Sequence, residues 1–493
     1  MTNGNKSSDS LKNGEIAIAA KWSTAAELIS KLFLPISSLI LARILTPEEF
    51  GIVATITMVL SLSDIISEAG FHKYIIQHQF ENADSLHASA NVAFWTNQGI
   101  SLIIWIIIAI LNDSIATLVG CPGLGNVLVI ACVNIPLLGF SSIQSGLLKR
   151  DLNFKPLFYI RIFTSILPFV VTIPLALVYR NFWALIIGTI VKNVLTSFLL
   201  IVYTKWKPKL SFSFTRLKEM LSFSLWSMLE TFSIWINQYI DVFLVGTLLS
   251  QYYLGLYKTS LTLVGQCVGV ITSIFTPIIF SALSKLQNND SEFKRIFFKF
   301  QKIVALLVMP IGVVIFAESQ LITEICLGDQ WMEASRFIGL WGITSAFSIA
   351  SVRYCTELYR AKGWPLLCFL VQIIVLSFLL PSIYYSARIG FKELCLARSA
   401  VEIVYFLINI ILCYIYIHIT PKDFCRNLFI PIIASIALYI FLIIMKSVID
   451  FIFLRLVIIV IFSSLYYMLV FYFDKEVRNL FYSQIKSKFK FSH

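Results

Sequence analysis

Charged residues are scarce in this chain. Aspartate, glutamate, lysine and arginine make up 13% of its 493 residues, whereas 58% of the residues are hydrophobic. A soluble globular domain has about a quarter of its residues charged, so this composition excludes an ordinary soluble protein. Apolar runs of roughly 18 to 25 residues recur along the whole length, and each can cross the hydrocarbon core of a bilayer as a helix. The sequence therefore predicts an all-α integral membrane protein.

Motifs for several kinds of chemistry are also absent. The chain has no GxxxxGK[ST] segment, which excludes nucleotide hydrolysis by a P-loop, and its nine cysteines form no CxxC pair. Most of the cysteines fall within or beside apolar runs, where they are predicted to be small buried hydrophobic residues. His72, His78 and His87 share one loop at a spacing that fits no metal motif, and we expect that loop to be solvated. We therefore expect no metal, no cofactor and no enzymatic reaction.

The apolar runs imply about fourteen transmembrane helices. A basic connector, residues 205–218, divides the first twelve into two sets of six, and two further runs and a basic tail follow. We predict an N-terminal six-helix lobe (1–207), a C-terminal six-helix lobe (208–422), and two accessory transmembrane helices with a cytoplasmic tail (423–493). The predicted spans are 17–42, 50–69, 88–111, 125–147, 156–179, 183–204, 220–247, 257–283, 300–325, 334–358, 364–385, 394–417, 427–447 and 451–473.

Lysine and arginine are concentrated in the two tails and in alternate connections between the spans. By the positive-inside rule, this distribution predicts that both termini are cytoplasmic. It also accounts for the net charge of +12, so we exclude nucleic acid as a partner. The tail DKEVRNLFYSQIKSKFKFSH (474–493) either lies on anionic lipid as an amphipathic helix or serves only as a cytoplasmic retention signal, and the second interpretation is preferred.

The connection between the first two spans carries the signals of a helix start. In Leu41–Gly51, LARILTPEEFG, Thr46 can cap the second helix, Pro47 suits its first position, and the two following glutamates suit the positive end of the helix dipole. The pattern returns 204 residues later, where the run LLSQYYLG ends in Gly255 at the offset of Gly51. This correspondence suggests duplicated halves, related by a pseudo-two-fold axis along the membrane normal.

Ionisable residues within the spans cost free energy unless they are paired or hydrated. Pairing within one helix is predicted at a spacing of four residues for Glu27 with Lys31, Arg353 with Glu357, and Arg398 with Glu402. Asp64 and Glu68 approach the end of the second span, where their side chains can reach the interface.

Three cations of the first six spans have no carboxylate nearby in their own helices. They are Lys21, Arg161 and Lys192. A water-filled cavity lined by unpaired cations would suit an anionic group such as a phosphate or pyrophosphate. We therefore predict such a cavity in the first lobe.

Asp241 is the most isolated acid of the second set of spans. It is a candidate for binding a coupling cation or a proton, and Glu27 is a second candidate for ion coupling. The alternative for Asp241 is a hydrogen bond to a neighbouring helix, and this alternative is preferred.

Two stretches of the chain resemble a known family. The first is Leu41–Gly51, followed by Gly70 and IIQ at 75–77; the second is FTPIIFSALSKLQNND at 275–290, then Pro310, then LGDQWMEASRFIGLWGI at 327–343. Over Ala20–Gly363 the chain is similar to Wzx-type polysaccharide and O-antigen flippases of the multidrug/oligosaccharidyl-lipid/polysaccharide exporter superfamily. In that family an arginine usually follows a glycine at the start of the second repeat. Here that glycine is Gly246 and the next residue is Thr247, so the two halves match imperfectly.

The resemblance implies two six-helix lobes around a central cavity, with two accessory helices. It implies that the protein moves undecaprenyl-pyrophosphate-linked oligosaccharide across the bacterial inner membrane by alternating access, for exopolysaccharide, capsule or lipopolysaccharide biosynthesis. Basic residues of the first lobe hold the pyrophosphate in related flippases, and Lys21, Lys31, Arg161 and Lys192 are the candidates by region. The implied partners are the lipid-linked oligosaccharide and, as candidates, a glycan polymerase and a chain-length regulator.

Two other functions stay open. A cation-coupled exporter of small amphiphiles could use the same fold, and it would have a smaller, acidic cavity. A membrane-embedded glycan polymerase would need clustered acids or a base beside an outward groove. The sequence contains no such cluster outside the two glutamates that begin the second span, and these glutamates are already explained as helix-start residues.

Overall fold

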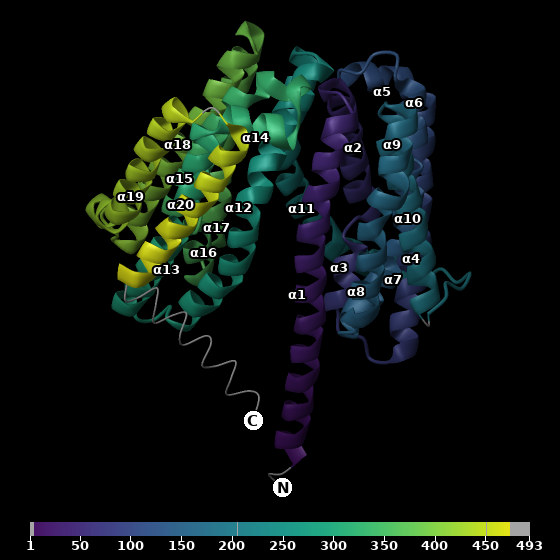
Figure 1. Ribbon diagram of the computed structural model, residues 1–493. Coiled ribbons are helices and arrows are strands. Elements are labelled where there is room, and N and C mark those ends of the chain that lie inside the picture. The colour runs from purple at the N-terminus through teal and green to yellow at the C-terminus, as the bar shows by residue number, and fades with distance from the viewer. Residues whose placement is uncertain (1–3, 205, 450, 474–493) are drawn as a thin grey trace. The chain divides into compact units, whose positions relative to one another are not determined.

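The computed structural model describes residues 4–204, 206–449 and 451–473, and every regular element in these ranges is a helix (Figure 1). The fold class predicted from the sequence is therefore confirmed. The predictions for the tail, residues 474–493, lie outside the described residues. By its internal contacts the chain divides into two compact units, Met1–Lys258 and Thr259–His493.

The first unit contains the elements from the amino terminus to the start of the twelfth α-helix. They are α1 (Gly4–Ile44), α2 (Pro47–Glu68), α3 (Phe71–Gln77), α4 (Ala83–Ile110), α5 (Asn112–Leu118), α6 (Gly125–Ala131), α7 (Asn134–Arg150), α8 (Phe154–Leu167), the π-helical turn η1 (Pro168–Thr172), α9 (Ile173–Tyr179), α10 (Trp183–Tyr203) and α11 (Phe214–Leu248). The next helix, α12 (Gln251–Lys285), begins in the first unit and continues into the second.

The second unit contains the remaining elements. They are α13 (Asp290–Ala317), α14 (Ser319–Cys326), the 3-10 turn η2 (Asp329–Ala334), α15 (Ser335–Ser351), α16 (Cys355–Ala361), α17 (Pro365–Ile389), α18 (Phe391–Ile417), α19 (Pro421–Val448) and α20 (Ile452–Phe473). Its main core joins residues of α12, α13 and α15 to α18, among them Phe297, Val304 and Tyr359.

Eleven segments of the described chain are long and apolar enough to cross a membrane, and they coincide with eleven of the predicted spans. The other three predicted spans coincide with α11, with the pair α15 and α16, and with α20, which fall outside that count. In α11 the polar residues Asn237, Gln238 and Asp241 lower the hydropathy, and α15 ends after 17 residues, at a turn before α16. The number fourteen therefore stays a prediction.

The division of the chain into lobes at residue 207 also stays a prediction. The boundary between the two compact units lies at residue 258, and α11 packs on α2, within the first unit.

The second helix begins where the sequence placed its start. Pro47 is the first residue of α2, and the carboxylate of Glu49 accepts hydrogen bonds from the backbone N–H of Thr46 (2.7 Å) and from its hydroxyl (3.1 Å). A carboxylate at this end satisfies a free backbone donor and faces the positive end of the helix dipole. The interpretation of Glu49 as a helix-start residue is thus confirmed.

Candidate functional site

The candidate site of the first unit begins where α1 meets α8. Arg161 on α8 places Nη2 3.1 Å from the Oε2 atom of Glu27 on α1, and its Nε donates a hydrogen bond of 2.7 Å to the hydroxyl of Ser30. Lys31 lies 3.7 Å from the other carboxylate oxygen of Glu27, so the predicted Glu27–Lys31 pair is confirmed. One carboxylate therefore faces two cations from two helices.

Aromatic contacts hold α1 and α8 together on both sides of this ion pair. Trp22 meets Phe158 edge to face at 4.8 Å between ring centroids, and Phe33 meets Phe169 of η1 at 5.9 Å. Such contacts each stabilise a packed pair by about 1 kcal/mol beyond the area that they bury. The position of Arg161 beside Glu27 is therefore fixed by packing as well as by charge.

The ion pair is open on one side. The side chains of Arg161 and Glu27 are 46% and 47% exposed. Arg161 lies seven residues into α8, about 10 Å from the start of that helix, within the thickness of a bilayer. A charge at this depth costs free energy against lipid, so we expect the open side to face water. These two residues therefore indicate a hydrated surface within the membrane-spanning part of the first unit.

The structure agrees with the prediction of an unpaired cation at two of the three positions. Lys21 on α1 and Lys192 on α10 are exposed, and neither has a carboxylate partner among the residues that the structure describes. For Arg161 the prediction was wrong, because Glu27 is supplied by a different helix. The charge of Lys192 interacts with that of Arg161, so these two cations belong to one group, and Lys21 stands six residues before Glu27 on α1.

A second polar group adjoins the first. His72 of α3 places Nδ1 3.0 Å from the backbone carbonyl of Ser142 and Nε2 3.3 Å from the Nζ atom of Lys149, both on α7. Ser142 donates its hydroxyl hydrogen bond, 3.2 Å long, to Glu68 at the end of α2. The charge of Lys149 interacts with that of Arg161, which links the two groups.

The expectation of a solvated loop was wrong for His72, whose side chain is only 14% exposed. Its neighbours Phe71 and Ile75 belong to a buried cluster with Phe94 of α4 and Ile143 of α7, which draws α3 against α7. The spacing of Phe71, Tyr74 and Ile75 at i, i+3 and i+4 around His72 was the available signal for a short buried helix. The sequence gives no indication that Lys149 would meet it, since the two residues are far apart in the chain.

Asp241 of α11 is buried, with 6% of its surface exposed. Its Oδ2 atom accepts a hydrogen bond of 2.9 Å from the hydroxyl of Tyr257 on α12, and its Oδ1 accepts one of 2.8 Å from the backbone of Val242. The preferred interpretation, a hydrogen bond to a neighbouring helix, is confirmed. A role in ion coupling stays a prediction for Asp241 and for Glu27.

The charged residues of the second unit are paired differently from the prediction in one case. Arg398 and Glu402 on α18 form the expected ion pair at 3.4 Å. Glu357 pairs with Arg360 at 3.1 Å instead of with Arg353, because the chain turns between α15 and α16 and no longer keeps helical spacing there. Arg353 is exposed and lies 5.8 Å from the ring centroid of Tyr405.

The burial of most cysteines agrees with the sequence prediction. Six of the nine cysteines are buried, whereas Cys267 and Cys425 are exposed and Cys326 is intermediate. Within residues 4–204, 206–449 and 451–473, no three or more His, Cys, Asp and Glu side chains gather closely enough to hold a metal ion.

The two corresponding helix starts contact each other in space. A Cβ atom added to Gly51 of α2 would overlap the backbone carbonyl of Gln251, and one added to Gly255 of α12 would overlap the carbonyl of Pro47. The two clashes correspond residue for residue at the offset of 204 seen in the sequence. Only glycine allows so close an approach, so α2 and the start of α12 meet backbone to backbone.

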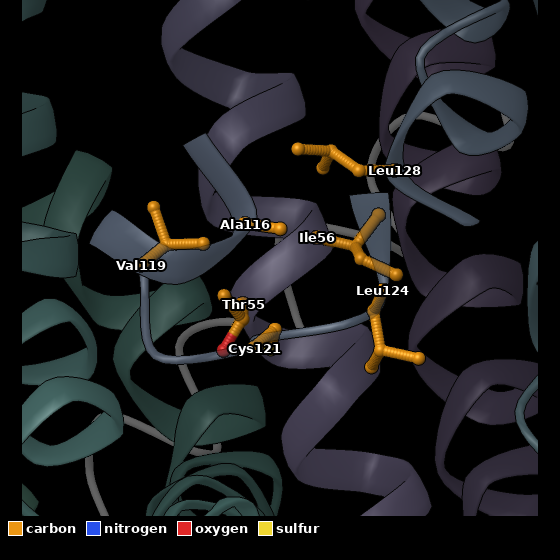
Figure 2. Close-up of a pocket in the computed structure, with 7 residues that line it drawn as sticks. All are labelled: Thr55, Ile56, Ala116, Val119, Cys121, Leu124 and Leu128. Atoms are coloured by element: carbon orange, nitrogen blue, oxygen red, sulfur yellow. The ribbon is translucent and has the colours of Figure 1, made fainter. Parts of the chain in front are cut away.

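The side chain of Gln251 connects this contact by hydrogen bonds to Thr55 and to the segment that follows α5. Its Nε2 donates a hydrogen bond of 2.7 Å to the carbonyl of Gly120, and its Oε1 accepts one of 3.1 Å from the hydroxyl of Thr55. Beside it lies a cavity of about 10 Å³, room for about one water molecule (Figure 2). Figure 2 shows Thr55 and Cys121 together on one side of this cavity, whose lining is otherwise apolar.

Cys121 provides a prediction about this end of the helices. Burial raises the pKa of its thiol to about 11, and only 5% of the residue is exposed. Because the thiolate is the reactive form, maleimide should label Cys121 at pH 7.5 at least about tenfold more slowly than an exposed cysteine. Variants in which either Cys121 or the exposed Cys425, near the start of α19, is the only cysteine give the comparison, and equal labelling rates would contradict it.

Two solved structures of membrane transporters share the fold of this chain. The chain matches the lipid II flippase MurJ in an inward closed conformation with a TM-score of 0.68 at 17% identity, over 94% of this chain and 99% of that one. It matches an inward-facing multidrug resistance MATE family transporter of the MOP superfamily with a TM-score of 0.62 at 13% identity, over 81% and 98% of the two chains. The chain therefore has the fold of the MOP-superfamily membrane transporters.

Within that class the sequence specifies the family. Residues 40–336 match the family of polysaccharide biosynthesis proteins, and the chain belongs to this family. This finding confirms the resemblance seen in Leu41–Gly51 and in residues 275–343.

Three curated relatives agree with this family. An uncharacterized membrane protein in the cps region of Klebsiella pneumoniae is 24% identical over 88% of this chain and 89% of its own length. The lipopolysaccharide biosynthesis protein WzxC of Escherichia coli K12 is 21% identical over 63% of each chain. The succinoglycan biosynthesis transport protein ExoT of Rhizobium meliloti is 23% identical over 62% of this chain and 61% of its own. The match thus spans about three fifths of the length of WzxC and ExoT.

Proposed function

We propose that this protein is a flippase for a lipid-linked oligosaccharide of the undecaprenyl-pyrophosphate type. It moves the pyrophosphate and glycan through a hydrated passage in the bacterial inner membrane while the lipid tail stays in the bilayer. The product serves the synthesis of a surface polysaccharide or lipopolysaccharide. The family, and the names of the relatives WzxC and ExoT, support this class of substrate.

The observation that carries the proposal is the open cationic group of the first unit. Arg161 and Lys192 have interacting charges and exposed side chains within membrane-spanning helices. Cations at such depth must face water or an anion, and guanidinium and ammonium groups are the usual partners of phosphate oxygens. Lys21 and Lys31 lie on α1 on either side of Glu27, the carboxylate that Arg161 meets, and add two cations to this part of the first unit.

We propose further that both termini are cytoplasmic. The start of α2 with Gly51 then lies at the outward end of the first unit, and the ends of α2 and α7, with Glu68 and Lys149, lie at the inward end. The cationic group is accordingly closer to the cytoplasmic side, where the substrate is made. A glycan polymerase and a chain-length regulator are proposed as protein partners on the other side.

Deleting the gene from its host tests the function. The lipid-linked oligosaccharide is expected to accumulate on the cytoplasmic face, and surface glycan is expected to fall, with both restored by a plasmid copy. The accumulated precursor is measured after lipid extraction. Normal surface glycan without precursor accumulation, in a strain that has no second flippase, would overturn the proposal.

Neutralising the cations tests the site. Replacing Lys21, Arg161 or Lys192 with glutamine should each lower flipping roughly tenfold, because a hydrogen bond to a charged partner contributes about 1.5–3 kcal/mol. The triple variant should be almost inactive. Lys446→Gln, at the exposed end of α19, is the control and should flip normally. Normal flipping in all three single variants and in the triple variant would rule out this site.

A cation-coupled exporter of small amphiphiles is the other function considered for this fold. It would need an acid free to bind a cation, and both carboxylate oxygens of the isolated Asp241 already accept hydrogen bonds.

A further inference from the structure

His72 has a protonation state that its two hydrogen bonds define. A carbonyl oxygen can only accept, so the contact with Ser142 requires a proton on Nδ1. An ammonium group can only donate, so the contact with Lys149 requires a lone pair on Nε2. Lys149 therefore holds His72 in its neutral form, and His72 in turn holds the ammonium of Lys149 beside α3.

Charged groups from several helices face this pair. Glu68 of α2 lies 3.7 Å from Nδ1 of His72, with Asp64 one turn before it, and Lys73 on α3 itself is paired with Glu230 of α11 at 3.4 Å. Burial and the charge of Lys149 lower the pKa of His72, whereas Glu68 opposes this effect. The neutral state is thus the resting state of His72 at neutral pH.

The ring of His72 also has little freedom to turn away. A Cβ atom on Gly146 of α7 would stand 3.4 Å from Nδ1, so the ring lies against bare backbone. If Nε2 gains a proton, two donors face each other across 3.3 Å, and the flexible lysine is the partner that can leave. The charge of Lys149 already interacts with that of Arg161, so the released ammonium remains within electrostatic range of the cationic group of the first unit.

We propose that His72 and Lys149 form a proton-linked switch that changes how tightly the cationic group of the first unit binds an anion. A proton from water binds the lone pair of Nε2, the hydrogen bond from Lys149 breaks, and the lysine turns toward an anion held by Arg161 and Lys192. The inference rests on the proposed function, and it adds a proton site that the cationic group alone does not have. By linkage, anion binding must favour the uptake of a proton at His72 to the same degree that the proton favours anion binding.

Binding of inorganic pyrophosphate to the purified full-length protein tests the switch. The affinity for pyrophosphate is measured at pH 8 and pH 6 at constant ionic strength. We expect the increase in affinity on going to pH 6 to be about tenfold larger for the wild type than for His72→Gln, within the usual range of coupling between sites. Glutamine can keep both hydrogen bonds but cannot titrate. The pH dependence that remains in His72→Gln therefore measures the effect of the titration of pyrophosphate itself. His87→Gln, at an exposed histidine near the start of α4, should behave as the wild type.

A second variant separates the switch from a structural role of His72. Lys149→Gln should bind pyrophosphate weakly at every pH and show no more pH dependence than His72→Gln. Equal pH dependence in the wild type and His72→Gln would overturn the switch while leaving the proposed function intact. Absence of pyrophosphate binding by the wild type at every pH would overturn both the switch and the cationic site, whatever the deletion strain accumulates.

Discussion

Replacing Gly51 with alanine is expected to lower flipping by roughly fivefold to 150-fold, since overpacking a close contact costs about 1–3 kcal/mol. The new Cβ would overlap the backbone carbonyl of Gln251, and no side-chain rotation can relieve a clash with backbone. Relief requires α2 and the start of α12 to separate, which breaks the hydrogen bonds from Gln251 to Gly120 and Thr55. We expect this contact to form in one state of the transport cycle, so a variant that cannot form it should transport slowly.

The position of the variant makes this prediction specific. Gly255→Ala should act in the same way, because its Cβ would overlap the carbonyl of Pro47. Gly99→Ala in α4 is the matched control, since the added Cβ would meet no atom within 4 Å outside its own stretch of helix. Flipping and maleimide labelling of a single-cysteine Cys121 protein are the measurements, and Cys121 should label faster in Gly51→Ala and Gly255→Ala. Normal flipping and unchanged labelling in both variants would contradict a role of this contact in transport.

Glu318→Ala is expected to destabilise the second unit by about 3–5 kcal/mol, the cost of leaving a buried partner charge unpaired. Glu318, between α13 and α14, is 2% exposed and forms an ion pair with Arg455 of α20, whose side chain is 15% exposed. Removing the carboxylate leaves the guanidinium without its counter-charge in a place with little water. Thermal unfolding of the purified full-length protein should occur several degrees lower.

Two comparisons separate this effect from ordinary loss of a charge. Glu318→Leu combined with Arg455→Met should recover most of the stability, because an apolar pair of similar size avoids the desolvation cost. Glu292→Ala breaks the exposed Glu292–Arg295 pair of α13 and should cost less than about 1 kcal/mol. Equal destabilisation by Glu318→Ala and Glu292→Ala would show that burial of the first pair contributes nothing.

Features that depend on neighbours in the chain could be predicted from the sequence. Long apolar runs located the helices, because hydropathy over some twenty residues decides whether a segment can cross a bilayer. The start of α2 at Pro47 and the pairs Glu27–Lys31 and Arg398–Glu402 were predicted correctly, because helix capping and a spacing of four residues are local properties. The pair Arg353–Glu357 was wrong because the turn between α15 and α16 interrupts helical spacing.

Composition, hydropathy and local motifs therefore predict a multi-helix membrane protein of the polysaccharide biosynthesis family, with cations inside its first spans. The contacts between helices became known from the folded chain: Arg161 with Glu27, His72 with Lys149, and the backbones of Gly51 and Gly255 with each other's helices. Hydropathy and helix signals act over only a few turns of one segment. Contacts between helices depend on how their surfaces pack, and a single sequence does not record that arrangement.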